Sequence, residues 1–348
     1  MSTILVLTVL LLTPDAPRAD VVIVVGAPGA PDYAPLFAEW SARWERAAEL
    51  GNARATVIGS ASSPLSKGEI GAVVDHLHAR ATPPNPPSER RDEVKTDRDR
   101  LKSALVDAAQ VADRPLWLVL IGHGTFDRRT ARFNLRGPDF SAQELGEWLK
   151  PLARPVAVID CTAGSAPFMG AVTGPQRVVI TATKGGAELN FARFGDFLSQ
   201  SITDPAADLD KDDQVSLWEA FLSASRRTAE FYQTDGRLMT EHALLDDNGD
   251  GQGTRADEFV GLQPAPNVKD RADTLDGSVA HQWHLVPSDA EAALPPEIRA
   301  RRNALELKIV ALRQQKKDLN EDEYFDRLEA LLIELARLSV SVENLKNR

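Results

Sequence analysis

The stretch Leu116-Trp-Leu-Val-Leu-Ile-Gly-His-Gly124 consists of six apolar residues followed by glycine, histidine and glycine. A short, uninterrupted apolar run of this kind favours a strand that is buried on both faces, as in a parallel sheet. The stretch Pro155-Val-Ala-Val-Ile-Asp-Cys161 repeats the pattern, again with polar residues at its end. The sequence therefore predicts two buried strands, each of which ends at a residue capable of chemistry.

Further strands and helices alternate around these two. Apolar, β-branched runs predict three more strands, at 21–25, 55–58 and 176–181. Helical spacing of apolar residues predicts helices over 33–50 and 97–111, and Ser141 with Glu144 has the pattern of a capping box at the start of another helix. The alternation of strand, helix and strand indicates an α/β fold with a doubly wound, mostly parallel sheet flanked by helices.

The character of the chain changes after Ile202, where acidic loops lead to one more predicted helix over 216–232. Residues 277–286 form the last predicted strand. From Pro296 a helical hairpin begins, and its second helix repeats apolar residues at steps of three and four, at Leu328, Leu331, Leu335, Leu338, Val342 and Leu345. That spacing is typical of a coiled-coil seam, which either folds back within the chain or pairs between chains.

Composition and charge argue against several classes of function. The 348 residues carry a net charge of -11, which argues against nucleic acid, and the single cysteine allows no intramolecular disulfide. No segment after the N-terminus has the ~18 consecutive apolar residues of a membrane helix. The run Ile4–Leu12, a polar break and the small residue Ala19 resemble a short secretory signal, which predicts a periplasmic or secreted protein. The alternative is that this run is a buried first strand of a cytoplasmic protein.

His123 and Cys161 are the strongest candidates for catalysis. Ligands of open parallel sheets bind beyond the carboxyl ends of the strands, and each of these residues stands just past such an end. If the two strands are neighbours, their ends lie about 5 Å apart. An imidazole activates a thiol to the nucleophilic thiolate and can then protonate a leaving amine. Without that pairing, the histidine is an ordinary polar residue and the cysteine a small buried apolar one.

The segments 118–124 and 156–165 resemble the two signature blocks of caspase-like cysteine peptidases, nearest to the legumain-type enzymes and their bacterial relatives. The resemblance covers 20–232. It implies a catalytic dyad of His123 and Cys161, an oxyanion hole from the amides of Gly124 and Cys161, and no cofactor for catalysis. The substrate would be a peptide or protein.

The same resemblance implies a specificity pocket walled by Thr181–Asn190, in which Lys184 and Glu188 are the charged candidates for substrate binding. Asp160 fills the acidic position often found before the nucleophile. Legumain-type enzymes select asparagine with an arginine after the first strand. Residues 26–32 contain no arginine, so selectivity for asparagine does not carry over to this chain.

Two acidic loops have the spacing of twelve-residue calcium loops, in which alternate oxygen ligands surround a hard cation. In the first loop the candidate ligands are Asp208, Asp210, Asp212, Gln214, Ser216 and Glu219. In the second they are Asp246, Asn248, Asp250 and Gln252, and the twelfth position is Asp257, a shorter ligand than glutamate. Structural Ca²⁺ is one interpretation; the other is an acidic loop that caps a helix without metal.

These patterns divide the chain into a signal peptide (1–19), a catalytic domain with the acidic loops (20–265), a linker (266–295) and a helical hairpin (296–348). The leading hypothesis is a cysteine endopeptidase. The alternative is a non-catalytic scaffold that assembles partners through the C-terminal helices. Gly26–Pro31 is a weak candidate for nucleotide binding, because its glycine spacing is not that of a dinucleotide fingerprint and its prolines remove amides that could bind phosphate.

Overall fold

The computed structural model describes residues 16–59, 95–268 and 275–346, with no side-chain detail beyond Val340. Its centre is a six-stranded sheet in the order β2-β1-β3-β7-β8-β9. The first five strands in that order run parallel and β9 is antiparallel to β8. The strands are β1 (Asp20–Val25), β2 (Arg54–Ile58), β3 (Leu116–Ile121), β7 (Val156–Asp160), β8 (Arg177–Thr181) and β9 (Leu244–Asp246).

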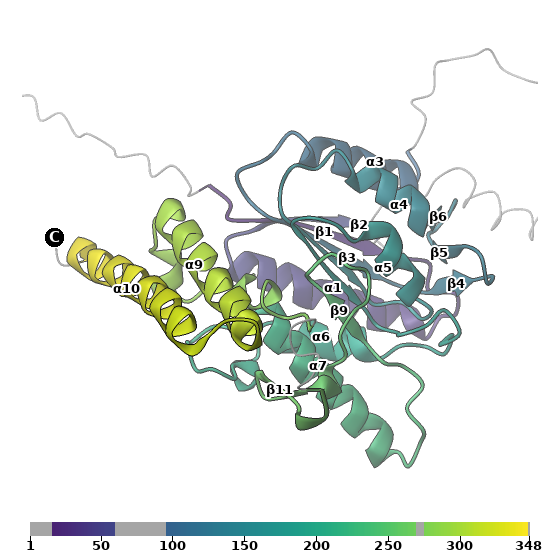
Figure 1. The fold of residues 1–348 in the computed structure, drawn as a ribbon. Coiled ribbons are helices and arrows are strands. Elements are labelled where there is room, and N and C mark those ends of the chain that lie inside the picture. Colours follow the sequence, from purple (N-terminus) through teal and green to yellow (C-terminus); the bar gives the residue numbers. More distant parts are fainter. Residues whose placement is uncertain (1–15, 60–94, 269–274, 347–348) are drawn as a thin grey trace, which may run out of the picture.

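Helices cover both faces of this sheet, which confirms the predicted doubly wound α/β architecture (Figure 1). One face packs against α1 (Tyr33–Leu50), α6 (Phe194–Ser201) and α7 (Leu217–Thr234). The other packs against α3 (Asp97–Ala108), α4 (Ala142–Leu149) and α5 (Ala166–Val172). All six residues of β1 and of β3 are buried, as the continuous apolar runs predicted.

Smaller elements complete the fold. A three-stranded antiparallel sheet at the end of β3 contains β4 (Gly124–Phe126), β5 (Ala131–Phe133) and β6 (Phe140–Ser141). A short ribbon pairs β10 (Phe259–Val260) with β11 (Gln263–Pro264). Short helices include η1 (Pro205–Ala207), η2 (Ala256–Glu258), η4 (Ala280–Gln282), α8 (Asp289–Ala292) and η5 (Gln315–Lys317).

The predicted strand at 277–286 does not form. The carboxylate of Asp247 accepts hydrogen bonds from the amides of Gly277, Val279 and Ala280, which pulls this segment into the turn of η4. Only an isolated bridge to Ser216 remains, at His284. The edge of the sheet is instead completed by β9, which is too short to give a clear pattern in the sequence.

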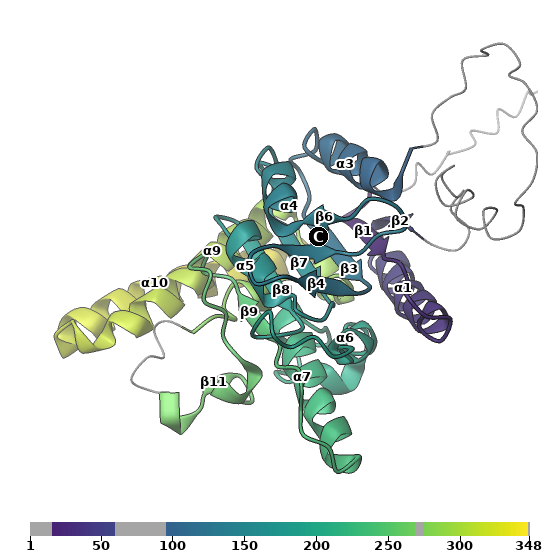
Figure 2. The ribbon, with the colours of Figure 1, turned by 90° about the vertical axis from the view of Figure 1, so that its right-hand side faces the viewer.

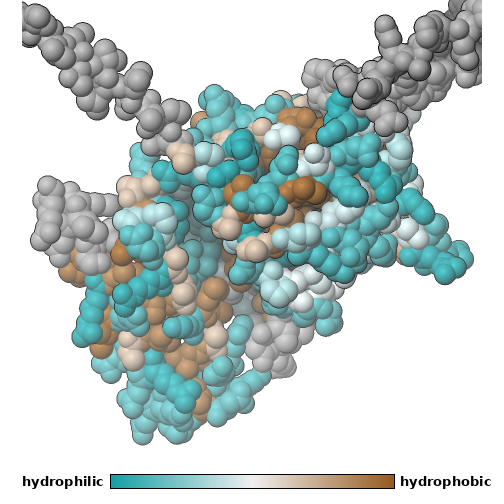
Figure 3. Space-filling view, turned by 90° about the horizontal axis from the view of Figure 1, so that it is seen from above, coloured by the Kyte–Doolittle hydropathy of each residue, from teal (hydrophilic) through white to brown (hydrophobic). Residues whose placement is uncertain are grey.

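The C-terminal hairpin folds back on itself. Helices α9 (Pro296–Gln314) and α10 (Glu321–Lys346) lie side by side, and α10 projects from the body of the molecule (Figure 2). Leu305 and Ile309 of α9 and Leu338 of α10 are buried. The surface seen from above mixes hydrophobic with hydrophilic residues (Figure 3). None of the described helices has the length and apolar character needed to cross a bilayer.

The predicted signal lies mostly outside the described residues. Its predicted end at Ala19 is described and takes part in the fold. The amide of Arg18 donates to the carbonyl of Asn52, and the amide of Arg54 donates to the carbonyl of Ala19. The chain before Asp20 therefore extends the pairing of β1 with β2 by contacts of its own.

Candidate active site

The ends of β3 and β7 are in contact. The two strands are paired, with Leu120 opposite Asp160, so His123 and Cys161 follow adjacent strands at the same edge of the sheet. Beyond the strands, Gly124 packs closely on the loop after Cys161. A Cβ on Gly124 would stand 2.5 Å from the carbonyl oxygen of Ala163 and 2.7 Å from Oγ1 of Thr162. Glycine is therefore required at this position by close packing.

Both candidate residues face the same side of the sheet, towards α1. Side chains alternate along each strand, and Cys161 belongs to the same buried cluster as Ile121 and Ile159. The ring of His123 lies 5.2 Å from the ring of Phe37 on α1, measured between centroids. The pairing of the strands and this shared face therefore place both residues on one side of the same sheet edge.

The imidazole of His123 is enclosed by aromatic side chains. Its ring centroid lies 4.8 Å from that of Tyr33 and 6.0 Å from that of Phe191. Its Nε2 lies 2.9 Å from the carbonyl oxygen of Pro28, in the turn after β1. Because a carbonyl oxygen only accepts, Nε2 carries the proton and donates it there. In neutral histidine this leaves Nδ1 as the basic nitrogen.

The thiol of Cys161 is closed off from solvent, with only 1% of the residue exposed. Gly195, the second residue of α6, stands against both Cys161 and Trp40. Burial raises the pKa of the Cys161 thiol, and the nearby charge of Asp160 raises it further. Within the described part of the chain, no hydrogen bond joins His123 to Cys161. The sulfur is therefore held as a buried, neutral thiol.

The predicted oxyanion hole is wrong in one of its two donors. The amide of Cys161 donates to the carbonyl of Leu120 at 3.0 Å, which continues the ladder between β7 and β3. A donor used in the sheet has no hydrogen left for a tetrahedral intermediate. Gly124 stays a candidate donor.

Asp160 cannot contact a substrate in this structure, contrary to the prediction from the sequence. It is fully buried, and its Oδ1 accepts hydrogen bonds from the amide and hydroxyl of Thr162. Its Oδ2 is buried without a partner among the described residues. Burial raises the pKa of Asp160 to about 6. Its role here is to shape the loop that carries Thr162.

The two charged candidates of the pocket segment differ in their surroundings. Lys184 is exposed. Glu188 is held inward: its carboxylate accepts from the amide of Lys184 at 2.9 Å and lies 2.6 Å from Nδ1 of His242. The carbonyl of Glu188 also accepts from the amide of Gly164, at 2.7 Å. Glu188 therefore ties the pocket segment to the loop after Cys161, and its carboxylate is already engaged.

Sequence reasoning missed the residue that holds the start of α6. Glu241 is 1% exposed, and its carboxylate accepts from the amides of Arg193 and Phe194 at 2.8 and 2.9 Å. The hydroxyl of Tyr232 donates to the same carboxylate at 2.9 Å. Burial raises the pKa of Glu241. A lone glutamate in a loop carries no sequence signal for such a role.

The first acidic loop brings three carboxylates together. Oxygens of Asp208, Asp210 and Asp212 lie within 4.8 Å of one another, as do ligand atoms of Asp210, Glu219 and His281. This donor set fits a hard cation in part. Glu219, however, already accepts from the amides of Leu209 and Asp210 with one oxygen and from Ser216 with the other. Gln214 bonds Asp212 with its amide nitrogen and Ser288 with its oxygen.

The second acidic loop is closed by its own backbone. Asp246 accepts from the amides of Gly249 and Gly251, Asn248 from Asp250, and Asp250 from Gln252. The twelfth position, Asp257, pairs with Arg255 and lies 65% exposed. The second loop thus fits a cation less well, because the residue that should close the coordination sphere points elsewhere.

Comparison with known proteins gives only structural likeness. No protein-family model matches the chain, and no curated protein matches it. The solved structures to which it is similar include caspases. One is the initiator caspase Dronc of Drosophila, at 11% identity and a TM-score of 0.40, over 69% of this chain and 82% of that one. Another is caspase-1 from Spodoptera frugiperda, at 9% identity and 0.38, over 66% and 86%.

Proposed function

We propose that this chain is a cysteine peptidase that cleaves peptide bonds with Cys161 as nucleophile and His123 as its base and acid. The observation that carries the proposal is the packing of Gly124 on the loop after Cys161, which brings the two strand ends together on one face of the sheet. A thiol and an imidazole placed so are the parts that acyl transfer needs.

The form described here is the resting state of that enzyme. A nucleophilic thiolate needs exposure and a nearby positive charge, whereas Cys161 lies in apolar surroundings that raise its pKa. Movement of the start of α6 away from Cys161 would expose the sulfur to substrate, since Gly195 stands against it. The imidazole must at the same time leave the carbonyl of Pro28 or present Nδ1 to the sulfur.

The experiment is hydrolysis of a peptide library by the full chain, with product identification by mass spectrometry. Cys161→Ala and His123→Ala should each lower kcat/KM by at least about 10³-fold, because residues that act as a unit fail together. Cys161→Ser is a third variant with nearly the same volume, so a loss of fold is separated from a loss of chemistry. Hydrolysis that persists unchanged in Cys161→Ala would refute the proposal.

A second candidate is a non-catalytic scaffold with the same fold. It is favoured by the buried sulfur and by the hydrogen bond that holds His123 to Pro28. A scaffold predicts that Cys161 stays inert towards peptide-based electrophiles under every condition in which the protein is folded. An enzyme predicts a single adduct, on Cys161, that His123→Ala slows.

We propose three further properties: bound calcium, export from the cytoplasm and self-association. Structural Ca²⁺ is proposed for the first acidic loop, where Asp208, Asp210 and Asp212 converge. Export rests on the N-terminal sequence and would be tested by fractionating cells that express the full chain. Assembly through α10 rests on its exposed apolar residues, Phe325, Leu332, Ile333 and Val340, and would be tested by sedimentation.

A further inference from the structure

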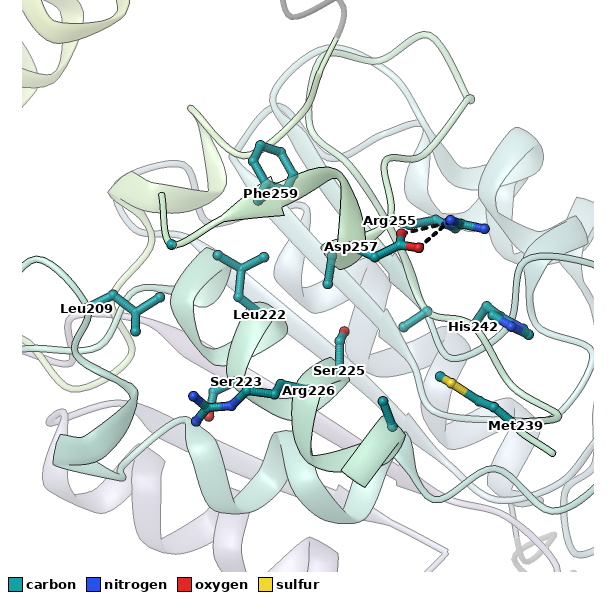
Figure 4. A pocket seen from close by; sticks show the side chains of 14 residues that line it. Leu209, Leu222, Ser223, Ser225, Arg226, Met239, His242, Arg255, Asp257 and Phe259 are labelled. Atoms are coloured by element: carbon teal, nitrogen blue, oxygen red, sulfur yellow. Dashed lines mark hydrogen bonds and ion pairs between the residues drawn. The ribbon is translucent and has the colours of Figure 1, made fainter. Parts of the chain in front are cut away.

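A cavity of about 560 Å³ lies between α7 and the chain from Met239 to Gly261. Figure 4 shows its wall: Leu222 and Phe259 on one side, Met239 and His242 on the other. Its volume is in the range of pockets that hold small molecules. None of the residues that line it belongs to the predicted dyad or to the predicted pocket segment.

The lining defines the chemistry of a ligand. Most of it is apolar, from Leu209, Leu222, Met239 and Phe259. The hydroxyl of Ser225 lies within the wall, buried and without a partner among the described residues (Figure 4). At the mouth stands the guanidinium of Arg226, 63% exposed and 3.7 Å from its neighbour Glu230. A guanidinium beside an apolar wall suits an apolar body that ends in a carboxylate.

Other charges around the cavity do not compete with Arg226 for that carboxylate. Arg255 is already paired with Asp257 through two hydrogen bonds. His242 turns its Nδ1 to Glu188. Arg226 is thus the cation at this mouth with the weakest carboxylate partner among those that line the cavity.

The wall of the cavity is also the support of the candidate active site. Met239, His242 and Ala243 line the cavity, and between them Glu241 holds the amides of Arg193 and Phe194 at the start of α6. The next residue of α6, Gly195, packs against the sulfur of Cys161. His242 in turn binds Glu188, whose carbonyl holds the loop after Cys161.

We propose that this cavity binds a small amphipathic carboxylate, and that the bound ligand keeps Cys161 covered. The proposal rests on the proposed function for its meaning, since it concerns regulation of the same site. The physical reason is linkage: a ligand that binds only the conformation with α6 closed stabilises that conformation by its own binding free energy. Opening α6 removes the partners of Glu241, so the segment 239–243 cannot keep the same shape when the sulfur is exposed.

The test uses the full chain and two readouts that need no peptidase activity. Octanoate is titrated by isothermal calorimetry, with octanamide as the uncharged analogue of equal length. Alkylation of Cys161 is followed by mass spectrometry at 0 and 1 M urea, where a rate independent of urea reports local opening and not global unfolding. At ten times its Kd, octanoate should slow alkylation about 10-fold, and octanamide should bind at least several-fold more weakly.

Two variants locate the site. Ala229→Trp, on the exposed side of α7, fills the mouth and should abolish binding, whereas Arg226→Ala should weaken octanoate and leave octanamide unchanged. Arg46→Ala, on the exposed face of α1, is the matched control and should change neither readout. The proposal is overturned if octanoate does not bind, if binding survives both cavity variants, or if bound octanoate leaves alkylation unchanged. An absence of peptide hydrolysis would refute the proposed function and leave these readouts intact.

Discussion

Gly195 leaves room for the sulfur of Cys161. A Cβ on residue 195 would stand 3.0 Å from Sγ and 2.6 Å from Cβ of Cys161, and 2.9 Å from the ring of Trp40. Real Cβ atoms do not approach that closely, so any side chain at 195 must move α6 or the strand end. The contact couples the position of a helix to the exposure of the candidate nucleophile.

Gly195→Ala should therefore loosen this contact. Overpacking in a close-packed core costs about 1–3 kcal/mol, partly offset by about 0.5–1 kcal/mol from better helix propensity. We expect a lower Tm together with faster alkylation of Cys161 under native conditions. Gly170→Ala in α5 is the matched control, because a Cβ there meets nothing within 4 Å. Equal Tm and equal alkylation in the two variants would contradict the coupling.

Glu241→Gln should release the start of α6. Glutamine can keep one oxygen on the amides of Arg193 and Phe194, but hydrogen bonds to a neutral amide oxygen are about half as strong as hydrogen bonds to a carboxylate, so the start of α6 is held less tightly. Alkylation of Cys161 should become at least several-fold faster, with the sulfur alkylated in the folded protein. Glu230→Gln, at an exposed position of α7, serves as the control. Unchanged alkylation in Glu241→Gln would show that this carboxylate does not hold the site closed.

Asp160 should make the stability of the folded protein depend on pH. Because the folded state keeps its proton up to a pKa of about 6 while the unfolded state loses it near 4, the wild type loses stability as the pH rises between these values. Asp160→Asn keeps an oxygen for Thr162 and carries no charge. Above pH 6 the variant should be more stable than the wild type, by about 3 kcal/mol at most. Parallel stability–pH curves for the two proteins would contradict this assignment.

Calcium should raise the Tm of the full chain if the first acidic loop binds it. At 100 times Kd the gain is about 2.7 kcal/mol. Asp210→Asn should remove the gain, since Asp210 belongs to both groups of converging ligands. Asp257→Asn in the second loop should keep it, because Asp257 is bound to Arg255. Burial raises the pKa of Asp210, so protons should compete and the effect of calcium should weaken as the pH falls. A gain in Tm that survives Asp210→Asn would place the ion elsewhere.

Local sequence patterns predicted helices and strands well where interactions between residues close together in the chain determine them. The helix 33–50 and the strand 116–121 form with the predicted bounds, because uniform burial and helical periodicity act along the chain itself. Ser141 and Glu144 form the predicted capping box, as hydrogen bonds between residues three apart do not depend on the rest of the fold. The strand at 277–286 failed because Asp247, thirty residues away, takes its amides.

The amino-acid sequence alone determined that an imidazole and a thiol each follow a buried strand, because apolar runs fix strands. The tertiary structure showed that these two strands are neighbours. The tertiary structure decided what those groups do at rest. Gly195 packs against Cys161, and the carbonyl oxygen of Pro28 accepts a hydrogen bond from His123. The carbonyl oxygen of Leu120 takes the amide of Cys161 into the sheet. Those contacts join residues that are far apart in the chain. Contacts of this kind leave no periodic pattern in the amino-acid sequence, so the sequence alone does not predict them.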